Sequence, residues 1–176
     1  LAISVLLLLI MMYGVVQGRK DMKWQYKTTT PEATRHLGEK LGHIFKPLSG
    51  IVYLTGDLGA GKTAITQGIV KGMGITAQVT SPTFALVNEY GDKSIKVVHM
   101  DLYRLLDFDE LEEIGFDDFL RDGSIILVEW PDLLIENRYE PLAALSLSRV
   151  EGEDDSRIIN LKTEDASLIE RVKQLG

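Results

Sequence analysis

The spacing of apolar residues in the first half of the chain alternates between a helical and an extended period. Residues 30–45 carry apolar side chains at helical spacing, and Thr30 and Pro31 at their start favour a helix N-terminus. Residues 51–54 form a short apolar run that predicts a buried strand. Residues 62–74 again predict a helix, which ends in glycines.

The second half of the chain contains more strand patterns than helix patterns. The expected strands are residues 84–91, 94–101, 124–129, 144–150 and 157–163, of which the last two predict a terminal hairpin. Residues 108–120 predict an acidic helix that breaks or bends near Gly115, and residues 164–175 predict an amphipathic helix. These elements indicate an α/β fold with a mixed sheet flanked by helices.

The first 21 residues differ from the rest of the chain. Residues 1–16 contain no charge, and Arg19 and Lys20 follow them. This run is shorter than the roughly 20 residues of a spanning helix, and it lacks the basic start of a signal peptide. It is a membrane anchor, a buried helix, or sequence outside the natural domain, and we favour the last. Residues 22–176 are then expected to form one domain, with no membrane role unless residues 1–16 are a real anchor.

Composition and charge narrow the class of function. Of the 176 residues, 45% are apolar and 26% are charged, as in ordinary globular proteins. The absence of cysteine excludes a disulfide scaffold, a cysteine-ligated metal and a thiol nucleophile. The net charge of −7 and the lack of a basic run argue against direct nucleic-acid binding. Acidic residues concentrate in residues 107–122, which predicts a solvated helix face or a docking surface for a basic partner.

Residues 56–63 read Gly-Asp-Leu-Gly-Ala-Gly-Lys-Thr and match the P-loop pattern G-x-x-x-x-G-K-[ST] between a predicted strand and a predicted helix. Glycines let backbone N–H groups turn toward phosphate oxygens, and the helix N-terminus adds a positive field. Lys62 is expected to reach the β- and γ-phosphates, and Thr63 to bind Mg²⁺. The sequence thus predicts a P-loop NTPase-like nucleotide site formed by Gly56, Gly59, Ala60, Gly61, Lys62 and Thr63.

Two acidic residues end apolar strands, where a magnesium-dependent phosphate site needs carboxylates. Asp101 ends residues 94–101, and Glu129 ends the apolar run of residues 125–129. We expect one to lie beside the metal and the other to orient the attacking water. The cleaner apolar run before Glu129 favours Glu129 as the metal ligand, and Asp101 is the second candidate. A helix cap or a surface ion pair is the alternative for either residue.

Three further residues near this site have competing interpretations. Thr83 lies in a Ser-Pro-Thr loop that either reaches the γ-phosphate or is a plain turn. We interpret His99 as a core residue rather than a catalyst, and Trp130 as packing rather than base stacking. The chain has no [NT]-K-x-D pattern to read guanine, which favours adenine, and no arginine-rich lid of a nucleotide kinase. A small-molecule kinase and a nucleotide-gated adaptor with negligible turnover remain alternatives to an ATPase.

Taken together, the motifs resemble the TsaE (YjeE) family, the P-loop ATPases of bacterial tRNA threonylcarbamoyladenosine biosynthesis. The resemblance rests on the ordered motifs Gly-Asp-Leu-Gly-Ala-Gly-Lys-Thr, Ser-Pro-Thr-Phe, His-Met-Asp-Leu-Tyr-Arg and Val-Glu-Trp-Pro, in residues 56–63, 81–84, 99–104 and 128–131. It covers residues 28–131 well and the C-terminal hairpin loosely. It implies a cytoplasmic, Mg²⁺-dependent ATPase, weak alone, that works with the TsaB and TsaD proteins and meets tRNA only indirectly.

The resemblance also assigns roles to residues of this chain. It implies that residues 59–64 hold the phosphates of ATP, although Ala64 stands where many members have a second threonine, and there the backbone N–H can serve. Thr63 and Glu129 would lie on the Mg²⁺ side, while Thr83 and Asp101 would act as hydrolysis or switch residues. Thr30 would contribute to adenine binding. Separately, the acidic charge leads to the hypothesis that Asp109, Glu110, Glu112 and Glu113 dock the protein partner.

Overall fold

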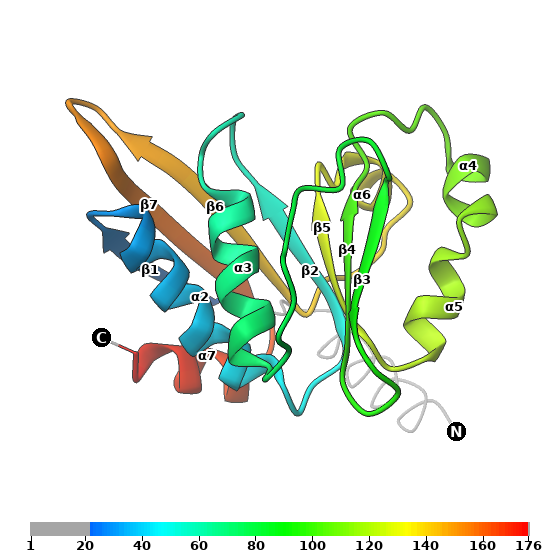
Figure 1. Cartoon of the computed structure of the whole chain (residues 1–176), viewed down its shortest axis with the longest axis horizontal. Coiled ribbons are helices and arrows are strands. Elements are labelled where there is room, and N and C mark those ends of the chain that lie inside the picture. Colours follow the sequence, from blue (N-terminus) through cyan, green and yellow to red (C-terminus); the bar gives the residue numbers. More distant parts are fainter. Residues whose placement is uncertain (1–21, 176) are drawn as a thin grey trace, which may run out of the picture.

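The computed structural model describes residues 22–175, which form one mixed sheet with helices on both faces (Figure 1). The strands are β1 (Met22–Thr28), β2 (Gly50–Thr55), β3 (Val87–Gly91), β4 (Lys96–Asp101), β5 (Ile125–Glu129), β6 (Ala143–Val150) and β7 (Glu153–Thr163). The helices are α2 (Pro31–Phe45), α3 (Lys62–Gly72), α4 (Phe108–Glu113), α5 (Phe116–Arg121), α6 (Asp132–Glu136) and α7 (Ala166–Lys173). The expectation about residues 1–21 lies outside the described residues. Within residues 22–175, no helix is long and apolar enough to cross a bilayer.

The sheet has the strand order β1-β7-β6-β2-β5-β4-β3. Strand β2 pairs in parallel with β5 and β6, and β4 pairs in parallel with β5. The outer pairs β1–β7, β6–β7 and β3–β4 are antiparallel. The predicted mixed sheet is therefore confirmed, and its parallel centre brings the ends of β2, β4 and β5 to one edge.

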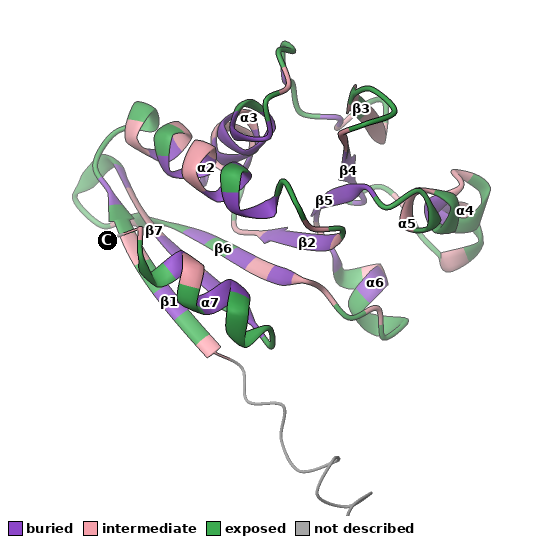
Figure 2. Ribbon diagram, turned by 90° about the horizontal axis from the view of Figure 1, so that it is seen from below, coloured by how far each residue is buried: buried purple, intermediate pink, exposed green. Residues whose placement is uncertain are grey.

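Apolar side chains of the central strands are buried on both faces of the sheet (Figure 2). In β5, Ile125 and Leu127 join a core beneath α2, α3 and α7, while Ile126 and Val128 join a second core beneath α4, α5 and α6. A strand covered on both faces has no polar side to alternate with, which explains its continuous apolar run. The result is a three-layer α/β/α arrangement.

Most predicted elements are present. The acidic helix is broken at Gly115 as predicted, where a φ of 76° lies in the left-handed region. The strand expected from residue 84 begins only at Val87, because Leu86 closes a turn by donating from its N–H to Pro82 O (2.7 Å). Strand β1 and the short helix α6 were not predicted, although Met22, Trp24 and Tyr26 of β1 alternate with polar residues and pack on the core.

Candidate functional site

The loop of residues 56–61, which we call the phosphate loop, joins the end of β2 to the start of α3. Gly56, Gly59 and Gly61 have φ angles of 135°, 75° and 105°, a region that side chains rarely adopt. Helix α3 begins at Lys62, and its N-cap Gly61 provides no side-chain bond to the first N–H groups. These free donors and the helix dipole suit an anion. The strand–loop–helix context that the P-loop pattern requires is therefore present.

The side chain of Lys62 is buried and folds over the phosphate loop. Its Nζ donates to the carbonyls of Gly56 (2.7 Å) and Asp57 (3.1 Å). The same ammonium lies 3.9 Å from Glu129 Oε2 and 4.8 Å from the ring centroid of Trp130. The charge is thus fixed at the edge of the sheet, with one N–H still available after these two hydrogen bonds.

Asp101 and Glu129 are register partners at the ends of the parallel strands β4 and β5. Both are 4% exposed. The structure therefore brings together the two strand-end acids that the sequence singled out. Glu129 directs one carboxylate oxygen toward Lys62 and keeps the other 2.9 Å from His99 Nε2. Since an ionised carboxylate only accepts, His99 donates from Nε2 and orients Glu129.

His99 is fully buried in β4, as a core residue should be, yet it contacts the candidate site directly. Its Nδ1 is buried and has no hydrogen-bond partner among the described residues. With Nε2 protonated, Nδ1 carries only a lone pair, which is less costly to bury alone than an unpaired N–H. No local sequence pattern indicated that this histidine would position Glu129.

The Ser-Pro-Thr loop is tied to Asp101. Thr83 Oγ1 donates to Asp101 Oδ2 (3.0 Å) and lies 2.9 Å from Ser81 Oγ. The backbone N–H of Tyr103 donates to Asp101 Oδ1 (3.1 Å). Both oxygens of Asp101 are thus held by loops that follow α3 and β4. Thr83 thus lies in a turn that also contacts Asp101, and its contact with the γ-phosphate stays a prediction.

The remaining predicted residues lie around the loop. Thr63 and Ala64 are in the first turn of α3, and Thr63 is half-buried. Thr30 is exposed and caps α2 by accepting from Ala33 N (3.0 Å). It follows Thr28, which is the register partner of Arg157, and Arg157 in turn contacts the phosphate loop. Thr30 therefore lies at the end of β1 nearest the loop, while its contact with adenine stays a prediction.

Two residues that sequence reasoning missed also touch the loop: Arg149 and Arg157 of the β6–β7 hairpin donate to its carbonyls. Nothing in the alternating strand pattern of residues 144–163 marked them, because their contacts join positions about 90 residues apart.

The donor set fits a magnesium ion that is shared with phosphate. Among residues 22–175, no group of three or more His, Asp or Glu side chains could hold a metal ion. Mg²⁺ usually keeps several waters and is bound through one or two carboxylates plus substrate phosphates. Glu129, Asp101 and the hydroxyl of Thr63 supply that type of incomplete oxygen set at the loop.

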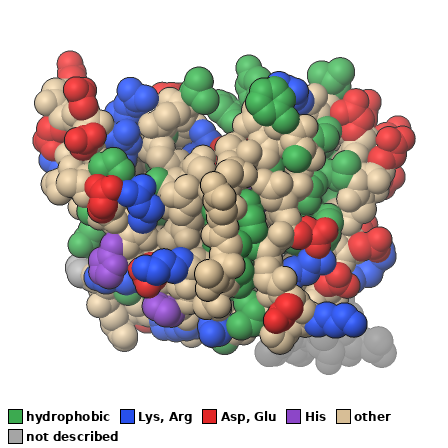
Figure 3. Space-filling model, in the orientation of Figure 1, with side chains coloured by type: hydrophobic (Ala, Val, Ile, Leu, Met, Phe, Trp, Pro, Cys, Tyr) green, Lys and Arg blue, Asp and Glu red, His purple; other side chains and the backbone are tan. Residues whose placement is uncertain are grey.

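Exposed apolar side chains gather along the same edge of the molecule, at the top of Figure 3. This apolar rim comprises Leu58 of the phosphate loop, Phe84 of the Ser-Pro-Thr loop, and Tyr103 and Leu106 of the segment that follows β4. Leu58 and Phe84 are 89% and 86% exposed, and the guanidinium of Arg104 lies 4.8 Å from the ring centroid of Phe84. Large exposed apolar side chains beside a site indicate a surface that a partner covers.

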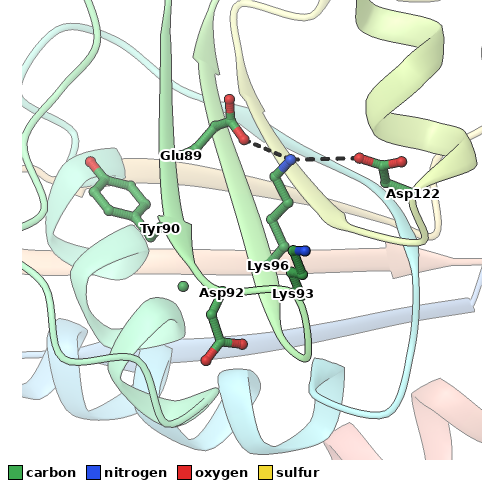
Figure 4. A pocket seen from close by; sticks show the side chains of 7 residues that line it. Glu89, Tyr90, Asp92, Lys93, Lys96 and Asp122 are labelled. Carbon is green, nitrogen blue, oxygen red and sulfur yellow. Dashed lines mark ion pairs between the residues drawn. The ribbon is translucent and has the colours of Figure 1, made fainter.

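A separate pocket of about 450 Å³ lies at the β3–β4 turn and is lined by residues 89–93, Lys96 and Asp122 (Figure 4). It is at the start of β4, so Asp101 and the phosphate loop are at the opposite edge of the sheet. Lys96 there lies 2.6 Å from Glu89 and 3.6 Å from Asp122, and Glu89 raises the pKa of Lys96. Lys96 is thus paired with two carboxylates, so the pocket offers less to an anion than the phosphate loop does.

Comparisons with known proteins agree on one family. A family model described as "Threonylcarbamoyl adenosine biosynthesis protein TsaE" matches residues 28–159. A Bacillus subtilis protein named "tRNA threonylcarbamoyladenosine biosynthesis protein TsaE" is 37% identical over 139 residues, which is 79% of this chain and 84% of the relative. A Rickettsia felis protein of the same name is 35% identical over 79% of this chain and 81% of its own. The crystal structure of Bacillus subtilis YdiB superposes with a TM-score of 0.70 and 30% identity, over 88% of this chain and 97% of that one.

Proposed function

The chain belongs to the TsaE family, which acts in tRNA threonylcarbamoyladenosine biosynthesis, and on that basis we propose that it is a Mg²⁺-dependent ATPase controlled by protein partners. The partners would be the TsaB and TsaD proteins in the cytoplasm, with tRNA met only through them. The chain itself carries a net charge of −7, as expected for a subunit that does not bind tRNA directly.

The observation that carries this proposal is the convergence of three elements on one edge of the sheet. The phosphate loop supplies backbone N–H groups, β5 supplies Glu129, and Lys62 Nζ lies 3.9 Å from the Glu129 carboxylate. β4 adds Asp101 as the register partner of Glu129. A glycine-rich turn with a purely structural role would need neither a buried lysine nor two buried strand-end acids.

Each residue then has a role that follows from its contacts. Residues 59–64 bind the phosphates through N–H groups, and Lys62 exchanges its bonds to the Gly56 and Asp57 carbonyls for the β- and γ-phosphate oxygens. Thr63 and Glu129 bind the metal, because the Glu129 carboxylate lies beside Lys62, the residue that reaches the same phosphates. The bound Mg²⁺ would neutralise charge on the β- and γ-oxygens.

Asp101 is better placed for the water than for the metal. Its carboxylate is shared with Thr83 and the N–H of Tyr103, so its position depends on the Ser-Pro-Thr loop. A loop that senses the γ-phosphate through Thr83 would move Asp101 with it. We therefore assign Asp101 to orienting the attacking water and Thr83 to sensing the γ-phosphate.

Control by partners is supported by two surfaces. The apolar rim lies on the loops that form the site, so a protein that covers it would also exclude water from the phosphates. The acidic side chains of α4 and α5 lie beside the rim, at the right of Figure 3, and offer charge complementarity to a basic partner.

The test is the ATPase rate of wild type, Lys62→Ala, Glu129→Gln and Asp101→Asn, each with and without TsaB–TsaD. Lys62→Ala should abolish nucleotide binding. The two acid variants should bind ATP and lose roughly 100-fold or more in rate, as when other transition-state contacts are removed. Lys71→Ala is the matched control, because Lys71 is an exposed lysine of the same helix that pairs with Glu39.

The outcomes separate the three functions. Stimulation of ATP hydrolysis by TsaB–TsaD supports the proposal. Phosphoryl transfer to a small acceptor that alone raises ATP use supports a kinase, while tight binding without turnover, even with partners, supports an adaptor. Normal hydrolysis by both acid variants would show that the metal and water roles are wrong.

A further inference from the structure

The β6–β7 hairpin contacts the phosphate loop through two arginines. Arg157 of β7 donates from Nε to Ala60 O (3.0 Å) and from Nη2 to Gly59 O (3.3 Å). Arg149 of β6, its register partner, reaches Leu58 O from Nη2 over 3.5 Å. Three consecutive carbonyls of the phosphate loop are therefore bonded to guanidinium groups of one distant hairpin.

These bonds also set the direction of the N–H groups that a phosphate needs. Across a trans peptide, a carbonyl and the following N–H point in opposite directions, and the described residues contain no cis peptide. Holding the carbonyls of Leu58 and Ala60 therefore orients the N–H groups of Gly59 and Gly61. The intervening Ala60 N–H is used inside the loop, where it donates to Asp57 O (3.0 Å). The N–H groups of Gly59 and Gly61 remain for an anion.

The guanidinium of Arg157 is itself fixed in place. Its Nη1 donates to Asp154 O and Ser156 O, both at 2.7 Å, within its own hairpin. The planar fork is thus anchored on one side to the hairpin and on the other to the loop. A lysine ammonium could not satisfy both sides in this geometry.

The hairpin approaches the loop closely at two glycines, and at Gly56 the approaching atom belongs to the backbone. A Cβ at Gly59 would lie 2.4 Å from Arg149 Nη2, and a Cβ at Gly56 would lie 2.3 Å from Leu147 O of β6. The two guanidinium groups also bring positive charge to the phosphate loop of a chain whose net charge is −7. Both features favour an anion at this loop.

We propose that Arg157, with a smaller contribution from Arg149, is a positioning residue that holds the phosphate loop in the form that binds a nucleoside di- or triphosphate. The inference rests on the proposed nucleotide site. It adds that the affinity of that site depends on the C-terminal hairpin, which carries none of the P-loop motif.

The test compares Mg-ADP binding by full-length wild type, Arg157→Met, Arg157→Lys and Arg149→Met, using calorimetry. Arg157→Met should raise the Kd on the order of tenfold, since two charge-assisted hydrogen bonds are lost. Arg157→Lys keeps the charge without the fork and should fall between wild type and Arg157→Met, while Arg149→Met should have a smaller effect. Arg171→Met is the matched control, because Arg171 of α7 also bonds a backbone carbonyl, Ile44 O (2.8 Å).

A second readout separates positioning from general loss of structure. The amide resonance of Gly61 should shift on Mg-ADP addition in wild type and Arg171→Met, and less in Arg157→Met at saturating ligand, with melting temperatures measured in parallel. If Arg157→Met binds within about twofold of wild type with the same Gly61 shift, the inference is wrong. If that variant does not fold, Arg157→Lys is judged by the same criterion. Failure of wild type to bind Mg-ADP, or unchanged binding by Lys62→Ala, would instead refute the proposed function.

Discussion

Gly68 lies where the phosphate-binding helix α3 meets α2, and its replacement by alanine tests how closely the two helices approach. A Cβ at Gly68 would lie 2.0 Å from Arg35 O and 2.8 Å from Glu39 N and Gly38 Cα. All three are backbone atoms of α2, so no side-chain rotation can relieve the contact. The helices would have to separate by about 1 Å or more to restore ordinary contact distances.

Two opposing terms decide the effect of Gly68→Ala on the free energy of unfolding. Alanine in a helix interior is favoured over glycine by about 1 kcal/mol. Overpacking in a tightly packed contact costs about 1–3 kcal/mol, and a clash between backbones belongs at the upper end or beyond. The net expectation is a loss of about 1–2 kcal/mol, which in a domain of this size lowers the Tm by about 3–8 °C.

Thermal unfolding followed by circular dichroism measures this shift directly. The control is His43→Ala, at an exposed position of α2 where alanine adds helix propensity without a new contact. Its Tm should be equal to or slightly above that of wild type. A Gly68→Ala protein that melts at or above the wild-type temperature would show that propensity outweighs the clash and that α2 and α3 are not in such close contact.

Two further predictions concern pH and partners. Burial, with a contribution from Glu140, raises the pKa of Tyr53 from 10 to about 12. The neutral Tyr53 side chain therefore contributes fully to the free energy of unfolding below pH 10, and this contribution is lost as the pH rises to about 12. Tyr53→Phe should remove this alkaline loss of stability, as measured by urea unfolding at each pH. At neutral pH the substitution should cost about 1 kcal/mol, because Tyr139 O loses its 2.6 Å hydrogen bond. If the variant loses stability at alkaline pH as wild type does, Tyr53 is not the source of that loss. Reversing exposed charge on α4 should weaken co-elution with TsaB–TsaD and leave the melting temperature and basal ATPase rate unchanged, whereas unchanged co-elution would exclude α4 as the docking surface. The substitutions are Asp109→Lys, Glu112→Lys and Glu113→Lys.

The features of the site that could be predicted are those that depend only on residues adjacent in the sequence. A glycine-rich loop between an apolar strand and a helix needs only neighbouring residues to be recognised, and the structure places residues 56–61 between β2 and α3. Asp101 and Glu129 each follow an apolar strand, and parallel pairing of β4 with β5 brings their ends side by side. The break at Gly115 follows from glycine tolerating a positive φ.

The parts that were not predictable depend on long-range pairing. The terminal hairpin could be recognised from its alternation, but no local pattern states that β6 pairs in parallel with β2. That pairing places Arg149 and Arg157 beside the phosphate loop, across about 90 residues of sequence. Likewise, His99 contacts Glu129 only because their strands are neighbours. The apolar residues around His99 in the sequence correctly predicted its burial, but they did not predict this contact.

This dependence has a consequence for how the site is controlled. The loop's backbone is held within the loop by glycine geometry, by Lys62 and by the bond from Ala60 N–H to Asp57 O, and from outside by guanidinium groups of the hairpin. Displacement of the hairpin tip (residues 149–157) would therefore release the carbonyls of Gly59 and Ala60 while the core residues of β6 and β7, such as Leu145 and Leu161, stay packed, because Arg157 is only half-buried and its contacts are polar. A partner that touches the hairpin, in addition to the apolar rim, would by the same bonds alter the affinity for phosphate without contacting the nucleotide.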